Sequence, residues 1–182
     1  CAWPMTETQN NEELRKACMQ AVENRASENE ASHALVHRSL IAARLKDRDA
    51  LTQALTDLMN SKIYYNSLMT NHDFDRGSCY CTDFAIGYLG ILSESLAFSD
   101  TGVIEILPCL PNSGFDAGEI TGIRARTRAL INDLKWDTAA GTASVTVTSD
   151  IAQTIEISCG LSGETQSIAF AAGETKTIEF TF

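Results

Sequence analysis

The chain has 182 residues, enough for one large domain or two small ones with a well-buried core. Its 14 basic and 24 acidic side chains give a net charge of -10, which argues against a nucleic-acid partner or an anionic membrane because both attract a cationic face. A neutral or cationic ligand is easier to accommodate. No run of about 18 apolar residues occurs, so the sequence predicts no spanning helix.

The chain begins CAWPMTETQ, with no Met at position 1 and neither the basic nor the apolar region of a signal peptide. We therefore expect a signal peptide to be absent or already removed, and we interpret the start at Cys1 as that of a fragment. A secreted and a cytoplasmic location both stay open.

The six cysteines include no CxxC pair. Cys79 and Cys81 form a CxC, but a tetrahedral zinc site needs two more ligands at similarly close spacing. We expect buried or free thiols, no metal and no cofactor, although the even count keeps a disulfide possible.

The first half of the chain has the pattern of helices. In NNEELRKACMQAVENRA, Leu14, Cys18 and Val22 recur every four residues and Asn10 or Asn11 can cap the first turn. The next segment, NEASHALVHRSLIAARLKD, is apolar on most sides and should be more deeply buried. Asp47 then caps DRDALTQALTDLMNSK, which has a clear apolar stripe, and the short junction predicts an antiparallel pair.

A short helical turn at KIYYNSLMT, an irregular stretch NHDFDRGSCYC and a helix from about Asp83 to Ala97 should follow. After residue 102 the apolar residues recur every second position. Seven short segments rich in Thr, Ile and Val predict a small antiparallel β domain, most simply a sandwich: VIEIL, EITGIRARTR, ALINDLKWD, ASVTVTS, TIEISCG, QSIAFAA and TKTIEFTF.

The sequence thus predicts an α+β protein with a helical region over 1–101 and an antiparallel β domain over 102–182. Pro108 and Pro111 stand near the junction, where proline can end a strand. The apolar segment 31–45 needs neighbours on several faces, and the chain has too few helices to surround it. Either a second chain covers this segment, or the chain is the end of a longer helical toroid.

The passage GVIEILPCLPNSGFDAGEITGIRARTRALINDLKWD resembles the C-terminal passage of the family 95 glycoside hydrolases, the inverting α-L-fucosidases and their relatives. The resemblance spans residues 33–160 and is most specific in its middle. Thr127 and Arg128 replace two glycines of the family pattern. The matching residues are Gly102, Ile104, Leu107, Pro108, Leu110, Pro111, Gly118, Gly122, Ile123, Arg124, Ala125, Arg126 and Trp136.

The resemblance implies an N-terminal β domain, an (α/α)6 barrel and a C-terminal β domain in the whole enzyme. The present chain would then be the last barrel helices, the end of an α/α toroid, followed by the C-terminal β-sandwich. This also accounts for the segment 31–45, whose missing neighbours would be earlier barrel helices.

The resemblance also implies a catalytic base. Counting back without gaps from Pro108 through Glu94 places Asp83 on the family's basic aspartate and Gly87 on the last glycine of its motif. A helix N-terminus favours the charged form of Asp83, which suits a base. The simpler alternative is that Asp83 is an ordinary helix cap.

The sequence departs from the family around this aspartate. Phe84 and Ala85 replace a Gly-Asn pair, so fucose specificity does not carry over. The general-acid glutamate and the asparagines that orient water lie in earlier barrel helices and have no counterpart here. Inverting hydrolysis needs two carboxyl groups about 6.5–9.5 Å apart, and this chain would supply one. Glu94, about three turns along the same helix, is too far away to be the other.

Further candidates for substrate binding stand in the loop before Asp83. His72, Asp75, Arg76 and Tyr80 could contact sugar hydroxyls, as could Asp73, although a solvated polar loop explains them as well. Tyr64 and Tyr65 could stack on a sugar or simply pack.

Other polar and aromatic residues favour structural roles. His33 and His37 stand four apart on a predicted helix and could share a metal, but HALVH lacks the Glu of HExxH, and packing or surface exposure is the favoured interpretation. We expect Arg124 and Arg126 to bridge the β domain to the helices and Trp136 to lie in the core.

The sequence therefore predicts a C-terminal fragment of an α-L-fucosidase-like glycoside hydrolase, acting on a carbohydrate and inactive alone. Its partners would be the upstream part of its own chain or a second copy, with apolar surface exposed on the helical half. The alternative is a non-catalytic helical-plus-β module that binds carbohydrate or another protein.

Overall fold

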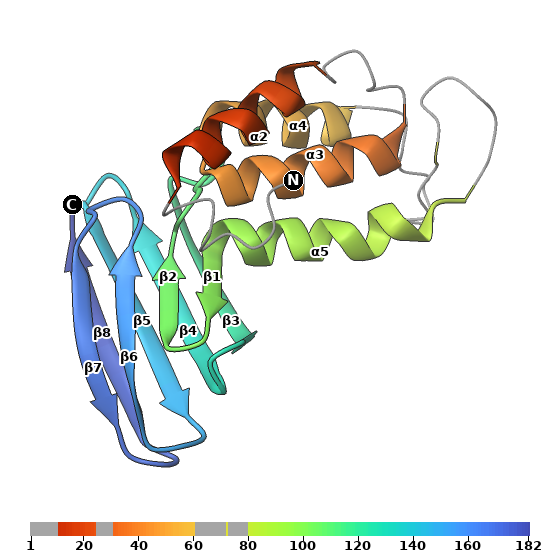
Figure 1. Ribbon diagram of the computed structural model, residues 1–182. Coiled ribbons are helices and arrows are strands. Elements are labelled where there is room, and N and C mark those ends of the chain that lie inside the picture. Colours follow the sequence, from red (N-terminus) through yellow and green to blue (C-terminus); the bar gives the residue numbers. More distant parts are fainter. Residues whose placement is uncertain (1–10, 25–30, 61–71, 73–79) are drawn as a thin grey trace. The chain divides into compact units, whose positions relative to one another are not determined.

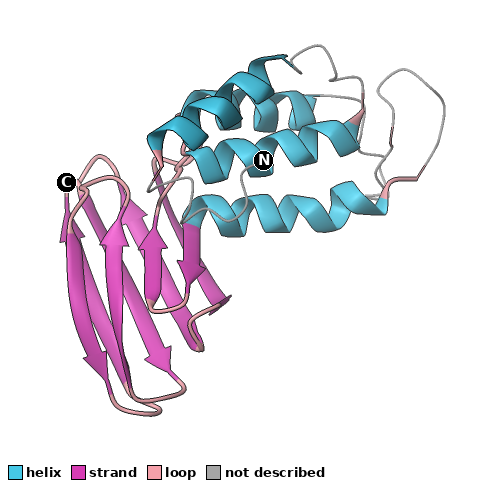
Figure 2. Ribbon diagram, in the orientation of Figure 1, coloured by secondary structure: helices cyan, strands magenta, loops and turns pink. Residues whose placement is uncertain are grey.

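A computed structural model describes residues 11–24, 31–60, 72 and 80–182. The chain divides into two compact units, Cys1–Glu94 and Ser95–Phe182. The first is helical and the second is built of strands, which confirms the α+β class (Figures 1 and 2). No helix among the described residues is long and apolar enough to span a bilayer.

The helical unit contains α2 (Glu12–Asn24), α3 (Ser32–Leu45), α4 (Arg48–Asn60) and α5, which starts at Thr82 and ends at Leu96. Two predicted caps are confirmed. The Leu14 N–H donates to Asn11 Oδ1 at 3.0 Å, and the Ala50 N–H donates to Asp47 Oδ1 at 3.0 Å. Side-chain acceptors at these positions satisfy N–H groups that have no partner within the helix.

The turn between α3 and α4 makes them neighbours, as predicted. Lys46 takes the left-handed conformation, with φ 59°, and its N–H donates to Ala43 O. The Asp47 N–H donates to Ala42 O, so the last carbonyl groups of α3 are satisfied within two residues. The side chains buried on α3 and α4 include Leu35, Leu45, Leu51 and Leu58.

The β unit contains two four-stranded sheets, with strand orders β1-β2-β6-β7 and β3-β4-β5-β8. The strands are β1 (Ala97–Asp100), β2 (Val103–Ile106), β3 (Ala117–Ala125), β4 (Ala129–Asp137), β5 (Thr142–Ser149), β6 (Gln153–Cys159), β7 (Thr165–Phe170) and β8 (Thr175–Thr181). Their inward-facing side chains form one core that includes Ile104, Ile131, Val145 and Ile157. Trp136, 7% exposed, belongs to it as predicted.

Two details of this unit differ from the prediction. The helix was expected to run to about Ala97 and no strand was expected before residue 102, but Ala97–Asp100 form β1, which pairs with β2 in antiparallel register. The pair β2–β6 is parallel, whereas an antiparallel domain was expected. The two-residue period of a strand does not distinguish parallel from antiparallel pairing. The relative direction of two paired strands depends on which distant segment of the chain lies beside the strand.

The motif LPCLP turns the chain after β2 and packs it into the core of the β unit. Leu107 has φ 49°, a conformation uncommon for a residue with a side chain, and is 1% exposed. Its N–H donates to Leu96 O at 2.7 Å, and Gly160 N–H donates to Ile106 O at 2.8 Å. A Cβ on Gly160 would lie 2.5 Å from Leu107 O, so a glycine permits this close approach.

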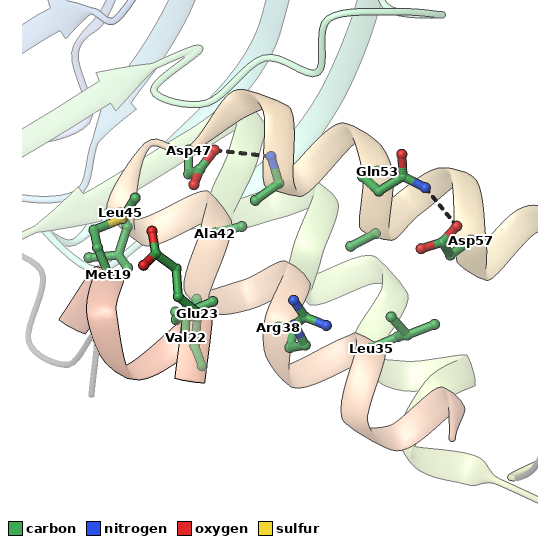
Figure 3. A pocket seen from close by; sticks show the side chains of 13 residues that line it. Met19, Val22, Glu23, Leu35, Arg38, Ala42, Leu45, Asp47, Gln53 and Asp57 are labelled. Carbon is green, nitrogen blue, oxygen red and sulfur yellow. Dashed lines mark hydrogen bonds between the residues drawn. The ribbon is translucent and has the colours of Figure 1, made fainter. Parts of the chain in front are cut away.

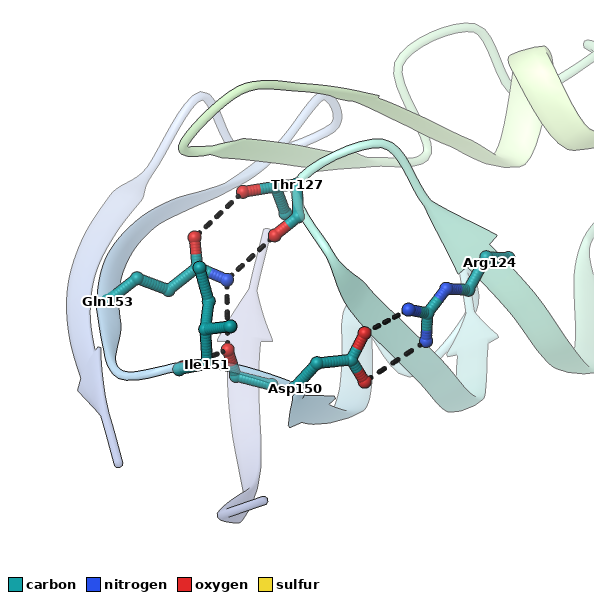
Figure 4. A network of polar contacts seen from close by, with 6 residues as sticks. Arg124, Thr127, Asp150, Ile151 and Gln153 are labelled. Carbon is teal, nitrogen blue, oxygen red and sulfur yellow. Dashed lines mark hydrogen bonds and ion pairs between the residues drawn. The ribbon is translucent and has the colours of Figure 1, made fainter. Parts of the chain in front are cut away.

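The two arginines of the family-like passage make contacts within the β unit. Arg124 forms a two-pronged ion pair with Asp150, and this hydrogen bond lowers the pKa of the Asp150 carboxyl (Figure 4). Arg126 donates from Nη1 to Ser99 O at 3.0 Å and lies over the Phe98 ring. Both arginines therefore join segments of one sandwich.

A second polar group, beside this pair, ties the turn after β3 to the turn after β5 (Figure 4). Gln153 Nε2 donates to Thr127 O at 2.7 Å and to Ser149 Oγ at 2.9 Å. Thr127 Oγ1 in turn accepts from the Gly102 N–H at 2.9 Å. Thr127 and Ser149 are buried, so this amide satisfies groups that water cannot reach.

Replacing Gln153 with Ala should lower the free energy of unfolding by about 1–3 kcal/mol, because buried acceptors lose their donor. Gln166→Ala is the matched control, since the hydrogen bonds of Gln166 are exposed, and it should change stability by less than about 0.5 kcal/mol. Urea denaturation measures both. Equal effects from the two variants would contradict the role given to Gln153.

Candidate functional site

Helices α3 and α5 run parallel, which places both of their N-termini at one end of the helical unit. Three contacts along their length establish the direction: His33 with Asp83, Val36 with Gly87, and Arg44 with Glu94. In each contact, the residue on α5 stands 50 or 51 positions after its partner on α3. The other face of α3 packs against α2 and α4, so α3 has neighbours on several faces, as its apolar pattern requires.

A glycine makes the approach of the two helices possible. A Cβ on Gly87 would lie 2.5 Å from Val36 Cγ1, closer than two non-bonded carbon atoms can approach. Val36 is β-branched and has little freedom to rotate away. At the other end of the pair, Arg44 Nη2 lies 3.3 Å from Glu94 Oε1, and both side chains are mostly buried.

Where the two helices begin, a polar cluster gathers Asp83 and the other two histidines of the chain around His33. His33 Nδ1 lies 3.2 Å from Asp83 Oδ2. The His33 ring lies edge-on to His37, with centroids 4.6 Å apart, and stacks on His72 at 6.1 Å. The Ser32 N–H donates to His72 O at 2.8 Å, which ties His72 to the start of α3.

Asp83 occupies the first turn of α5, which begins at Thr82. Its side chain is 65% exposed and its carboxylate reaches across to His33. The positive end of the helix dipole stabilises a negative charge at this position. An exposed, ionised carboxylate beside imidazole groups can accept a proton from a bound water and can accept hydrogen bonds from sugar hydroxyls.

The structure places part of the predicted site. Asp83 and His72 belong to one cluster, and Tyr80, two residues before α5, is exposed. Asp75 and Arg76 lie outside the described residues, as do Asp73, Tyr64 and Tyr65.

His33 was not predicted to belong to this site. Its spacing from His37 suggests a shared helix face, but an i, i+4 pair indicates nothing about a carboxylate 50 residues away. The signal that could have found it is the scarcity of histidine, because the chain has only three.

The described cysteines have no part in this cluster. Cys18, Cys81, Cys109 and Cys159 are buried thiols, as expected. In the ranges that the structure describes, no group of three or more His, Cys, Asp or Glu side chains is arranged to hold a metal ion.

A separate hollow of about 240 Å³ lies between α2, α3 and α4, on the other face of α3 (Figure 3). Its lining is mostly apolar and includes Leu35, Ala42 and Leu45. Its three carboxylates already have partners: Asp47 caps α4, Asp57 accepts from Gln53 Nε2 at 2.8 Å, and Glu23 on α2 accepts from Gln20 Nε2 at 3.1 Å. The hollow is smaller than ordinary ligand sites and offers no converging polar groups, so we regard it as a packing gap.

In the β unit, residues 98–181 match the model of glycoside hydrolase family 95, C-terminal domain. This match confirms the resemblance to the C-terminal part of a family 95 glycoside hydrolase over these residues. The match covers seven of the eight strands in full and does not reach Asp83. No curated protein matches the chain.

Gly87→Ala should lower the free energy of unfolding of the helical unit by about 1–3 kcal/mol, since a methyl group overfills the contact with Val36. Gly90→Ala, one turn further along α5, has nothing within 4 Å of the added carbon and should be neutral or stabilising by up to about 1 kcal/mol. Urea denaturation followed by circular dichroism at 222 nm compares them. A Gly87 variant as stable as the Gly90 variant would show that α3 and α5 are not in close contact.

Proposed function

We propose that this chain carries the catalytic base and the C-terminal domain of a glycoside hydrolase that acts on an α-L-fucoside-like substrate with inversion. Two observations support the proposal. The β unit matches the family 95 C-terminal domain, and Asp83 stands exposed beside the His33 imidazole at the start of the helix that precedes that unit in the chain. The helical unit, Cys1–Glu94, would be the end of an α/α barrel.

In this proposal Asp83 deprotonates a water that attacks the anomeric carbon. A carboxylic acid on the opposite side of the sugar protonates the leaving oxygen, and inversion requires the two groups to stand about 6.5–9.5 Å apart. Glu94 cannot be that acid, because it lies about three turns along α5 and pairs with Arg44. The acid would come from the upstream part of the protein, and His72, Asp75, Arg76 and Tyr80 would contact the sugar.

The outer face of α5 supports the idea that more protein packs here. Ile86 and Leu89 are 74% and 66% exposed, and they follow Asp83 at intervals of three residues. Tyr80, 56% exposed, precedes the helix. Exposed apolar side chains at helical spacing typify a face that a partner covers. We propose that the upstream part of the protein covers this face, and that a second copy covers it when the chain is alone.

The rival proposal is a non-catalytic module that binds carbohydrate or protein. A shallow hollow of about 410 Å³ in the β unit is lined by Trp136, Thr142 and Glu179 among others. Sugar-binding modules use exposed aromatic rings, but this Trp is 7% exposed and donates from Nε1 to Phe115 O at 2.8 Å. The hollow therefore gives the rival no stacking surface.

Asp83→Asn, made in the protein as its source cells produce it, should reduce the rate of glycoside hydrolysis by about 10²–10⁴-fold, because an amide cannot accept the proton from water. Asp49→Asn changes an aspartate in the first turn of α4 and should leave the rate unchanged. The assay measures release of the sugar and, by NMR, its anomeric configuration. Full hydrolysis by the Asp83 variant would refute the base assignment.

The 182-residue chain alone should self-associate, and replacing Ile86 and Leu89 together with Glu should shift it toward monomer in sedimentation velocity. Two further negative charges could act by repulsion alone. The control therefore introduces Glu at Gln53 and Thr56, which are exposed polar positions on α4, and should leave the association unchanged. A monomeric wild-type chain at 100 µM, a trial concentration well above typical dimer dissociation constants of about 1 µM, would argue against a docking face on α5.

A further inference from the structure

We propose that His33 is a positioning residue for Asp83: it orients the Asp83 carboxylate so that one oxygen faces the attacking water. This inference rests on the proposed role of Asp83 as base and deepens it. The histidine belongs to a different helix from the aspartate, and the contact joins the first turns of α3 and α5.

The contact engages one of the two carboxylate oxygens. His33 Nδ1 lies 3.2 Å from Asp83 Oδ2, and Oδ1 has no part in this contact. The side chain of Asp83 is 65% exposed, and without a partner it would rotate among several rotamers. A contact with a ring that has neighbours of its own restricts that freedom before substrate arrives.

The surroundings of His33 keep its ring in place. His37, one turn further along α3, lies edge-on against it, and His72 stacks on it. His72 is itself tied to the start of α3 through the Ser32 N–H. The described titratable groups that face His33 are therefore His37 from the same helix, His72 from the preceding loop and Asp83 from α5. A general base benefits from being held in position before substrate binds, because a displacement of a catalytic group by about 1 Å can lower the rate about a hundredfold.

A conservative variant tests this orienting role. Asn at position 33 keeps a side-chain N–H group near the place of Nδ1, so it should retain the contact with Asp83 that His33→Ala removes.

The first experiment needs no activity. In the 182-residue chain, the ring-proton NMR signals of His33 should change position in Asp83→Asn at a fixed pH, because the ring loses the carboxylate that contacts it. Asp49→Asn should leave the ring signals of all three histidines unchanged. Unchanged His33 signals in the Asp83 variant would overturn the proposal, whatever the protein hydrolyses.

The second experiment uses the hydrolytically active protein from its source. His33→Ala should lower kcat by about 10–100-fold with a much smaller change in KM. His33→Asn should keep most of kcat, because its side-chain N–H group can take the place of Nδ1. If Asp83→Asn abolishes hydrolysis while His33→Ala leaves kcat at the wild-type value, the positioning role is wrong and the base assignment stands. If Asp83→Asn hydrolyses at the wild-type rate, the proposed function itself fails.

Discussion

The close approach of α3 and α5 at Gly87 is the constraint on which the candidate site depends. Because Gly87 has no side chain, Val36 packs directly against the backbone of α5. The helices then run in parallel, and the contact one turn earlier on each brings His33 to Asp83. The buried pair of Arg44 and Glu94 secures their other ends. A shift of α5 by one turn would move Asp83 about 5 Å along its axis and separate it from His33.

The evidence for family and the candidate chemistry lie in different units of the chain. The family match covers 98–181, where a sandwich core and the buried LPCLP turn determine a stable domain. The candidate base lies in the helical unit, on the helix that leads into β1. A core of this kind tolerates many side chains of suitable size, whereas a base must meet requirements of both geometry and charge. The match of the C-terminal domain therefore bears on the family, whereas the reaction is tested by variants of Asp83.

Local signals predicted most of the elements. Asn11 and Asp47 cap the helices that they were expected to cap, because capping depends on a few neighbouring atoms. Seven of the eight strands followed from alternation and turn residues. The sequence analysis missed β1, since AFSD is short, follows a helix without a break and pairs only through β2. The parallel pair β2–β6 was also beyond a local pattern, because its two strands are about 50 residues apart.

The sequence by itself determined the helical and β regions, their caps, the acidic charge and the family resemblance, because each depends on spacing or composition along the chain. The candidate base was likewise found by counting along the chain. Only the tertiary structure decided which side chains surround it. His33 meets the Asp83 carboxylate because two parallel helices begin at the same end, and the other two histidines contact the His33 ring. Side-chain contacts between distant segments depend on packing, and packing is a property of the folded chain.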